Sequence, residues 1–285
     1  MNLNPLSPRI PLGEWADKFL TWFQDVFGWL LDFISTVLTG MYTGLELVFA
    51  SPSFLIMTVI LAVIAWLCAG WKVGLVTLIG FYLVRAFNQW ENAMESLALV
   101  LVAVIIALII ALPVGVWAAK SKTVSAIVRP VLDFMQSMPA LAYLVPAIVM
   151  FSVGTVPGAI ATIIFALPPG VRFTELAIRQ VDGEVVEAAQ AFGAGPSHIL
   201  FRVQLPLALP TIMAGINQVI MLALSMVVLA GMAGADGLGG AIIEAISSVN
   251  VALGVEAGVS VVALAIFLDR VTAGLGRKGN RVAEA

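Results

Sequence analysis

The run from Leu97 to Ala119 contains no aspartate, glutamate, lysine or arginine, so a helix formed by it presents no charged side chain to water. It is longer than the roughly 20 apolar residues that a helix needs to cross the hydrocarbon core of a bilayer. Of the 285 residues, 61% are hydrophobic and 11% are charged, whereas about a quarter of a soluble domain is charged. This composition excludes an ordinary soluble enzyme, a disordered protein and a nucleic-acid-binding protein.

Further apolar stretches are long enough, alone or with their flanks, to be membrane spans. They are Leu47–Trp71, Val73–Val84, Phe134–Val171, Val203–Ala235 and the region from about Leu253 to Leu268. The stretch Phe134–Val171 is long enough for two spans, with a glycine- and proline-containing turn at residues 154–158. The sequence therefore predicts an all-α integral membrane protein with about seven transmembrane helices.

The basic residues are distributed unevenly between the two sides of the membrane. When the loops are assigned alternately to the two sides, one side receives Lys72, Lys120, Lys122, Arg129, Arg172, Arg179, Arg202, Arg270, Arg277, Lys278 and Arg281. The other side receives Arg9, Lys18 and Arg85. Because cytoplasmic loops are enriched in lysine and arginine, the first side is predicted to be cytoplasmic. The amino terminus is then outside and the carboxyl terminus is in the cytoplasm.

Residues 1–45 have a different pattern and are predicted to be an extracytoplasmic segment preceding the membrane domain at 46–285. Between Glu14 and Leu38, apolar residues recur at three- and four-residue steps and alternate with acidic and polar residues. Three of the apolar residues are tryptophans: Trp15, Trp22 and Trp29. An amphipathic helix with tryptophans is typical of the membrane interface. A helix packed on the rest of the protein fits the pattern equally well.

The longest polar interruption, residues 172–203, is predicted to be a cytoplasmic loop that contains a short helix. Asp182 can cap the start of this helix, and Gly193 can end it in a left-handed conformation. Pro196 suits the first position of a second helix, which leads back to Leu205. Small alanines on the short helix would allow another protein surface to approach closely. A docking element and a plain solvated loop remain equally open on composition.

The motif in this loop resembles the "EAA" motif of binding-protein-dependent ABC importer permeases. It comprises Glu187-Ala188-Ala189, Gly193 after three residues, and Val203-Gln204-Leu205-Pro206 after nine more, with valine where the family usually has isoleucine. Other stretches are similar to the glycine betaine/proline betaine branch of that family. They are Pro8–Leu12, Met135–Ala140, Phe165–Pro169, Ala214–Gln218, Leu222–Val228 and Gly234–Gly239.

The resemblance implies a type I ABC importer permease fold in a bacterial inner membrane. It assigns ATPase coupling to Asp182, Glu184, Glu187, Ala188, Ala189, Gly193, Leu205 and Pro206. The implied partners are a second permease copy, two ABC ATPase subunits, an extracytoplasmic substrate-binding protein and membrane lipid, and no nucleic acid. The chain itself would bind no cofactor, because it has no GxxxxGK[ST] phosphate loop. ATP and Mg²⁺ would be used by the ATPase partner, and this chain would not be an enzyme.

Residues that interrupt the apolar spans are the candidates for the translocation pathway. They are Gln136, Tyr143, Asn217, Gln218 and Ser225, and the candidate set also includes Met138 and Met226. The same polar groups could instead join helices to one another. The other function class considered is an autonomous secondary transporter or channel for a small polar solute. Cys68 and His198 are the only residues of their types, which excludes a cysteine-rich or multi-histidine metal site. An integral membrane enzyme would need a catalytic cluster, and His198 stands alone in the cytoplasmic loop.

Overall fold

The computed structural model of the chain describes residues 11–283, with side chains up to residue 276. Arg9 and the resembling residues 8–10 lie outside this range, and so do the side chains of Arg277, Lys278 and Arg281. The described residues form helices and turns and no strand. The helices are α1 (Leu12–Ala50), α2 (Phe54–Ala69), α3 (Trp71–Ala86), α4 (Trp90–Lys120), α5 (Lys122–Ser137), α6 (Leu141–Phe151), α7 (Thr155–Arg179), α8 (Gly183–Ala191), α9 (Pro196–Ile199), the π-helix η1 (Leu200–Gln204), α10 (Leu205–Met232), α11 (Leu238–Ser247) and α12 (Val251–Ala283).

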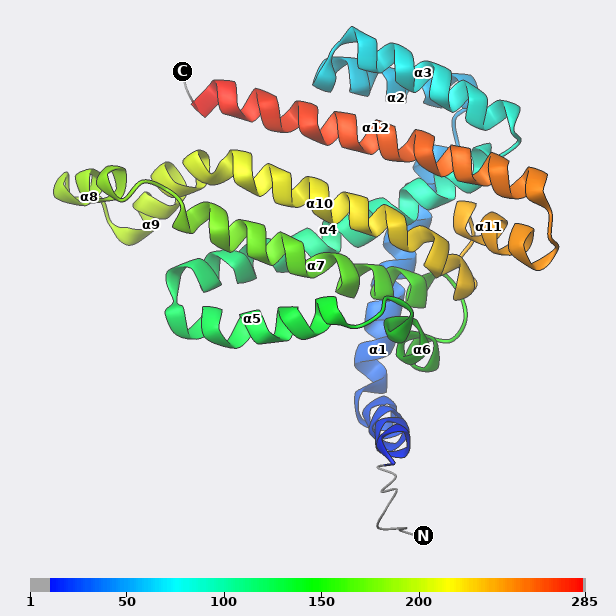
Figure 1. Cartoon of the computed structure of the whole chain (residues 1–285), viewed down its shortest axis with the longest axis horizontal. Helices are drawn as coiled ribbons and strands as arrows, with labels where there is room; N and C mark the ends of the chain where they lie inside the picture. Colours follow the sequence, from blue (N-terminus) through cyan, green and yellow to red (C-terminus); the bar gives the residue numbers. More distant parts are fainter. Residues whose placement is uncertain (1–10, 284–285) are drawn as a thin grey trace.

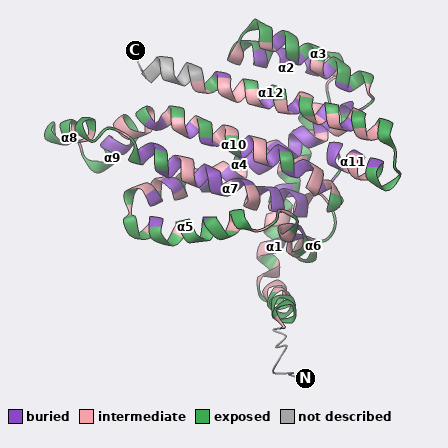
Figure 2. Cartoon of the chain, in the orientation of Figure 1, coloured by how far each residue is buried: buried purple, intermediate pink, exposed green. Residues whose placement is uncertain are grey.

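Helix α7 lies at the centre of the bundle, in contact with α4 and α10 (Figure 1). Small residues allow these helices to approach closely. A Cβ atom at Gly170 would lie 2.8 Å from the Cβ of Ala111 in α4, and one at Gly158 would lie 2.7 Å from the Cβ of Ala230 in α10. Close backbone approach of this kind stabilises helix pairs in a membrane, where lipid tails are as apolar as leucine. The same three helices supply much of the buried core (Figure 2).

Helices α2 and α3 form a hairpin that packs on α12 (Figure 1). Gly70 makes the turn between them with φ +98°. The predicted span Leu47–Trp71 is divided, because residues 51–53 interrupt the helix and residues 47–50 end α1. Each helix of the hairpin has 16 residues. A helix of this length is about 24 Å long, because each residue adds about 1.5 Å, whereas the hydrocarbon core of a bilayer is about 30 Å thick. Each helix of the hairpin is therefore too short to cross the core by itself.

Five helical segments of the described residues are long and apolar enough to cross a membrane, below the expected count of about seven. They are α1, α4, α7, the segment 196–232 that ends with α10, and α12. A sixth span results if α5 and α6, which are bent by 96° at their junction, are counted together. The count differs mainly because α2 and α3, which were predicted to be spans, are too short to cross the membrane. In the other direction, α1 is long and apolar enough to be a span, although most of it was predicted to precede the membrane domain.

The junction of α5 and α6 replaces the first of the two spans that were expected within residues 134–171. Helix α5 begins earlier, at Lys122, and ends at Ser137. Met138 is extended, with ψ 136°, because the residue before Pro139 is disfavoured in the helical region. The second predicted span agrees with α7, whose start follows the expected turn at Gly154.

Helix α1 spans 39 residues and is divided by a kink at Phe27, whose φ of −111° and ψ of 19° are not helical. The predicted domain boundary after residue 45 lies inside this helix. Its second half packs on α4 and buries Leu31 and Leu38, whereas most of its first half is exposed (Figure 2). Figure 1 shows α1 crossing the direction of α7, α10 and α12. The Gln24 side chain donates a hydrogen bond to the Val149 carbonyl of α6 (2.8 Å), which joins the first half to the bundle.

Candidate functional site

Helix α8 has the local structure that its sequence predicts. The carboxylate of Asp182 accepts a hydrogen bond from the backbone N–H of Glu184 (2.9 Å) and caps the helix. Gly193 follows the helix with φ +82°, the left-handed conformation that glycine adopts without steric cost. Pro196 then opens α9 in its first turn. Each of these features was derived from the sequence, and each is confirmed.

The two ends of the predicted coupling set lie in different environments. Helix α8 projects at the end of the bundle where α4, α7 and α12 also end (Figure 1), and none of its residues is buried. Glu184, Glu187 and Ala188 are exposed, and Ala189 is half-buried. Leu205 and Pro206 begin α10 and are half-buried at its base, where Leu205 packs against a buried cluster with members from α7, η1 and α10. The predicted coupling residues therefore belong partly to the exposed helix α8 and its flanks and partly to the start of α10.

Phe192 is an exposed aromatic residue at the tip of this element, with 93% of its surface accessible. Sequence analysis gave it no role, although it lies on the helix face of Val185 and Ala188. An exposed apolar side chain at this position is accessible to the surface of another protein. Val185, which is 42% exposed, extends this surface.

A groove of about 630 Å³ separates α8 from the end of the bundle. Glu187 and Gln190 line one side, and Arg179, Lys120 and Gln204 line the other. The Lys120 ammonium donates a hydrogen bond to the carbonyl of Pro196 in α9 (3.4 Å). The exposed helix is therefore held to the bundle mainly through its ends, and its outer face is free for a partner.

The last two turns of α7 correct the predicted extent of the cytoplasmic loop. Residues 172–179 were placed in the loop 172–203 because they are charged, but they continue α7 to Arg179. Glu175 is 3% exposed and accepts hydrogen bonds from the Ser125 hydroxyl (2.7 Å), the Arg129 guanidinium (2.9 Å) and the Arg179 guanidinium (2.9 Å). A buried carboxylate is tolerated when it is paired and hydrogen-bonded in this way.

This Glu175 cluster joins three helices next to α8. Ser125 and Arg129 belong to α5, and Arg179 also donates a hydrogen bond to the Ala118 carbonyl of α4 (2.8 Å). Only residues 180–182 separate Arg179 from α8. An ion pair between Arg172 and Asp133 links α7 to α5 again. The Glu175 cluster therefore connects the end of α7 nearest to α8 with both α4 and α5.

The predicted pathway residues of α10 point in different directions. Asn217 donates a hydrogen bond to Asp269 (3.0 Å) and accepts one from Thr272 (2.8 Å), both in α12. Its side chain thus joins two helices, which is one of the two roles considered for it. Met226 is buried, with 1% of its surface accessible. Gln218 and Ser225 are exposed, seven residues apart on one side of α10.

The other predicted pathway residues lie around the bend between α5 and α6. Gln136 is exposed and Met138 is half-buried. The Tyr143 hydroxyl donates a hydrogen bond to the Met135 carbonyl, so it ties α6 back to the end of α5. The bend therefore has a defined geometry and does not rest on Pro139 alone.

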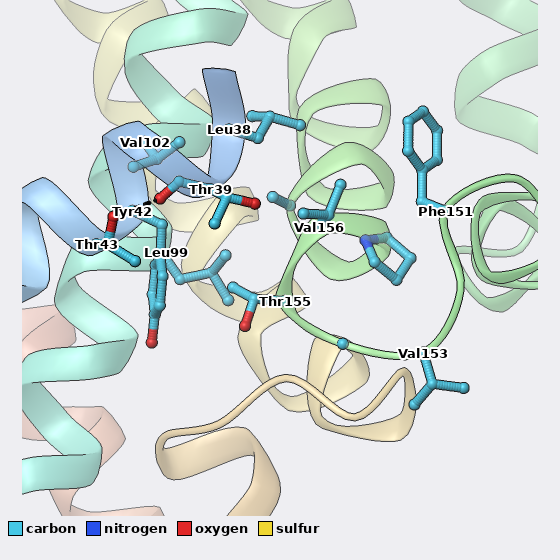
Figure 3. A pocket seen from close by; sticks show the side chains of 13 residues that line it. Leu38, Thr39, Tyr42, Thr43, Leu99, Val102, Phe151, Val153, Thr155 and Val156 are labelled. Carbon is cyan, nitrogen blue, oxygen red and sulfur yellow. Dashed lines mark hydrogen bonds between the residues drawn. The ribbon is translucent and has the colours of Figure 1, made fainter. Parts of the chain in front are cut away.

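A separate cavity of about 330 Å³ lies between α1, α4 and the segment that leads from α6 to α7 (Figure 3). Four side chains with hydroxyl groups line it: Thr39, Tyr42, Thr43 and Thr155. None of the predicted pathway residues is part of its wall. The cavity shows that the second half of α1 is a structural part of the bundle.

Comparison with known proteins gives the same family throughout. Residues 111–278, from the middle of α4 into α12, match the family model described as binding-protein-dependent transport system inner membrane component. A glycine betaine transport system permease protein of Bacillus subtilis, OpuAB, is 46% identical over 93% of this chain and 94% of its own length. The glycine betaine/carnitine transport permease protein GbuB of Listeria monocytogenes is 44% identical over 96% of this chain and 98% of its own length.

Two further comparisons extend the similarity. The glycine betaine/proline betaine transport system permease protein ProW of Escherichia coli is 43% identical over 95% of this chain and 78% of its own length. An inward-facing structure of the MetNI methionine ABC transporter contains a chain with a TM-score of 0.55 and 25% identity, over 66% of this chain and 91% of that chain. A second crystal form gives a TM-score of 0.58 at 24% identity and confirms the fold.

Proposed function

The chain belongs to the family of binding-protein-dependent transport system inner membrane components, and we propose that it is the permease of an importer for glycine betaine or a related quaternary ammonium solute. The observation that carries this proposal is the 43–46% identity to betaine permeases over more than nine-tenths of the chain. An autonomous carrier or channel, the other class considered, is not supported by this family membership.

The permease is proposed to work with two separate ABC ATPase subunits, which bind and hydrolyse ATP with Mg²⁺. The exposed helix α8, together with Phe192 at its tip, supports this role as the docking element. An extracytoplasmic protein would deliver the solute, and a second copy of this chain would complete the pathway. Selection of the solute would then rest largely with the delivering protein.

Coupling is proposed to run from α8 through α7 to the bend between α5 and α6. When the ATPase moves α8, residues 180–182 transmit the displacement to the end of α7. The Glu175 cluster then moves α5, because Ser125 and Arg129 are bonded to the same carboxylate. Tyr143 joins α5 to α6, so the bend would move with them. This is a rigid-body switch between two packed arrangements of helices.

The orientation proposed from the basic residues agrees with the position of α8. The carboxyl ends of α4 and α7 and the segment before α10 lie at the end of the bundle that carries α8 (Figure 1), and they contain Lys120, Arg179 and Arg202. This end would face the cytoplasm, with the amino terminus outside and the carboxyl terminus inside. The amphipathic first half of α1 would then lie near the outer surface of the bacterial inner membrane, which suits its exposed tryptophans.

The solute is proposed to pass along the exposed side of α10 and the bend between α5 and α6. Gln218 and Ser225 on α10 and Gln136 on α5 are polar and exposed in the single chain. Exposed polar side chains within a membrane domain need another protein surface or a water-filled path beside them. A second copy packed against this side would enclose them in a shared pathway.

The direct test is uptake of labelled glycine betaine by vesicles that contain the reconstituted permease, ATPase and binding protein. Uptake should require ATP on the side of the membrane that carries the ATPase subunits. It should also require the binding protein on the opposite side. Uptake by the permease alone, driven by an ion gradient, would contradict the proposal. Choline, carnitine and proline betaine as competitors would define the solute range.

A further inference from the structure

An apolar groove runs along the bundle between the α8-bearing halves of α4 and α10. Its cavity is about 730 Å³, and α4 contributes Leu112, Val116 and Trp117 while α10 contributes Leu209 and Ile212. Thr174 of α7 supplies the one hydroxyl group of the wall, and this hydroxyl already donates to the Gly170 carbonyl (2.7 Å). Apart from Lys120, the side chains of the wall therefore offer no free polar group to water or to a polar solute.

The charge and length of the groove identify what fits it. Lys120 is the one charged residue of its lining and lies at the α8-bearing end of α4, one turn beyond Trp117. Tryptophan and lysine at the end of a membrane helix typically meet the headgroup region. From Leu112 to Lys120 the helix rises about 12 Å, and from Leu205 to Ile216 about 16 Å. One leaflet of the hydrocarbon core is about 15 Å thick.

We propose that this groove binds one acyl chain of a phospholipid from the cytoplasmic leaflet, with the lipid phosphate held by Lys120. The floor of the groove includes Leu200 and Phe201 of η1 and Leu205 of α10, which connect α9 to the bundle. Lys120 also lines the groove beside α8 and contacts the Pro196 carbonyl. A lipid bound here would therefore touch both the root of the docking element and the lysine that holds it.

Filling the groove is the sharpest test. Leu209→Trp places a large side chain in the groove, and Leu207→Trp is the matched control because Leu207 is exposed on the same helix and does not line the groove. Native mass spectrometry of the purified full-length chain would count retained phospholipid and copies of the chain. We expect Leu209→Trp to reduce lipid retention roughly tenfold by excluding about two methylene groups, with the number of copies unchanged. Leu207→Trp should retain lipid like the wild type.

A second pair of variants leaves the core untouched, so it remains decisive if Leu209→Trp does not fold. Lys120→Gln should reduce lipid retention about threefold, as expected for loss of an exposed ion pair. Lys122→Gln, at an exposed position outside the groove, should have no effect. Equal retention by Lys120→Gln and Lys122→Gln would overturn the proposal. The proposal would also be overturned if Leu209→Trp separated the copies of the chain while the amount of bound lipid stayed the same. A helix of a second copy, and not a lipid, would then occupy the groove.

Discussion

Replacing Glu175 by glutamine removes the charge that joins α7 to α5 and keeps the shape of the side chain. Removing one partner of a fully buried ion pair costs about 3–5 kcal/mol. The Arg129 and Arg179 side chains are 58% and 33% exposed, so water can solvate them when the carboxylate is lost. The amide can still accept a hydrogen bond from Ser125. We therefore expect the free energy of unfolding to fall by about 1–3 kcal/mol.

The assay is thermal unfolding of the purified full-length chain, followed by transport in the assembled importer. Asp133→Asn is the matched control, because it breaks an ion pair between the same two helices whose side chains are 67% and 40% exposed. Such an exposed pair is worth about 0–1 kcal/mol. Glu175→Gln should lower the melting temperature more than Asp133→Asn does. The importer that contains Glu175→Gln should still hydrolyse ATP, but this hydrolysis should no longer drive uptake. Equal melting temperatures for the two variants would refute the assigned role of Glu175.

Four other changes test the docking element, the α10–α12 contact and the orientation. Gly193→Val should abolish coupled transport at normal membrane levels, because the φ of +82° costs a β-branched residue about 1–2 kcal/mol. Phe192→Ser should weaken copurification of the ATPase without changing the melting temperature, since the side chain is 93% exposed. Asn217→Leu should lower the free energy of unfolding by about 1–3 kcal/mol, measured by thermal unfolding, because its two partners on α12 lose their bonds. In a Cys68→Ser background, Ser197→Cys should resist a membrane-impermeant thiol reagent added to intact cells; labelling would reverse the topology.

The local structure of α8 and of the turn after it could be predicted from the sequence because its determinants are local. Asp182 bonds to a backbone group two residues away, and the conformation of Gly193 closes the turn directly after the helix. Pro196 acts through its own ring at the first turn of α9. No distant residue is needed for any of these features. The capping and turn residues therefore described the local structure of this part of the chain correctly.

The end of α7 could not be predicted in the same way, because its charges are neutralised by distant residues. Glu175 is bonded to Ser125 and Arg129, which are 50 and 46 positions away in the chain. Without those partners, three charged residues in two turns indicate an exit from the membrane.

The bend after α5 is an intermediate case. Pro139 indicates a break in the helix, but the angle of 96° depends on how α6 packs on α7 and α1.

The pathway residues show why adjacent polar residues in a span need separate treatment. Asn217 and Gln218 are neighbours, but each step along an α-helix turns the side chain by about 100°. Asn217 thus reaches α12 while Gln218 is exposed. Asp269 and Thr272 lie three residues apart on one face of α12, and Asn217 bonds to both. Asn217 therefore faces α12, whereas Gln218 is exposed and keeps the pathway role proposed for it.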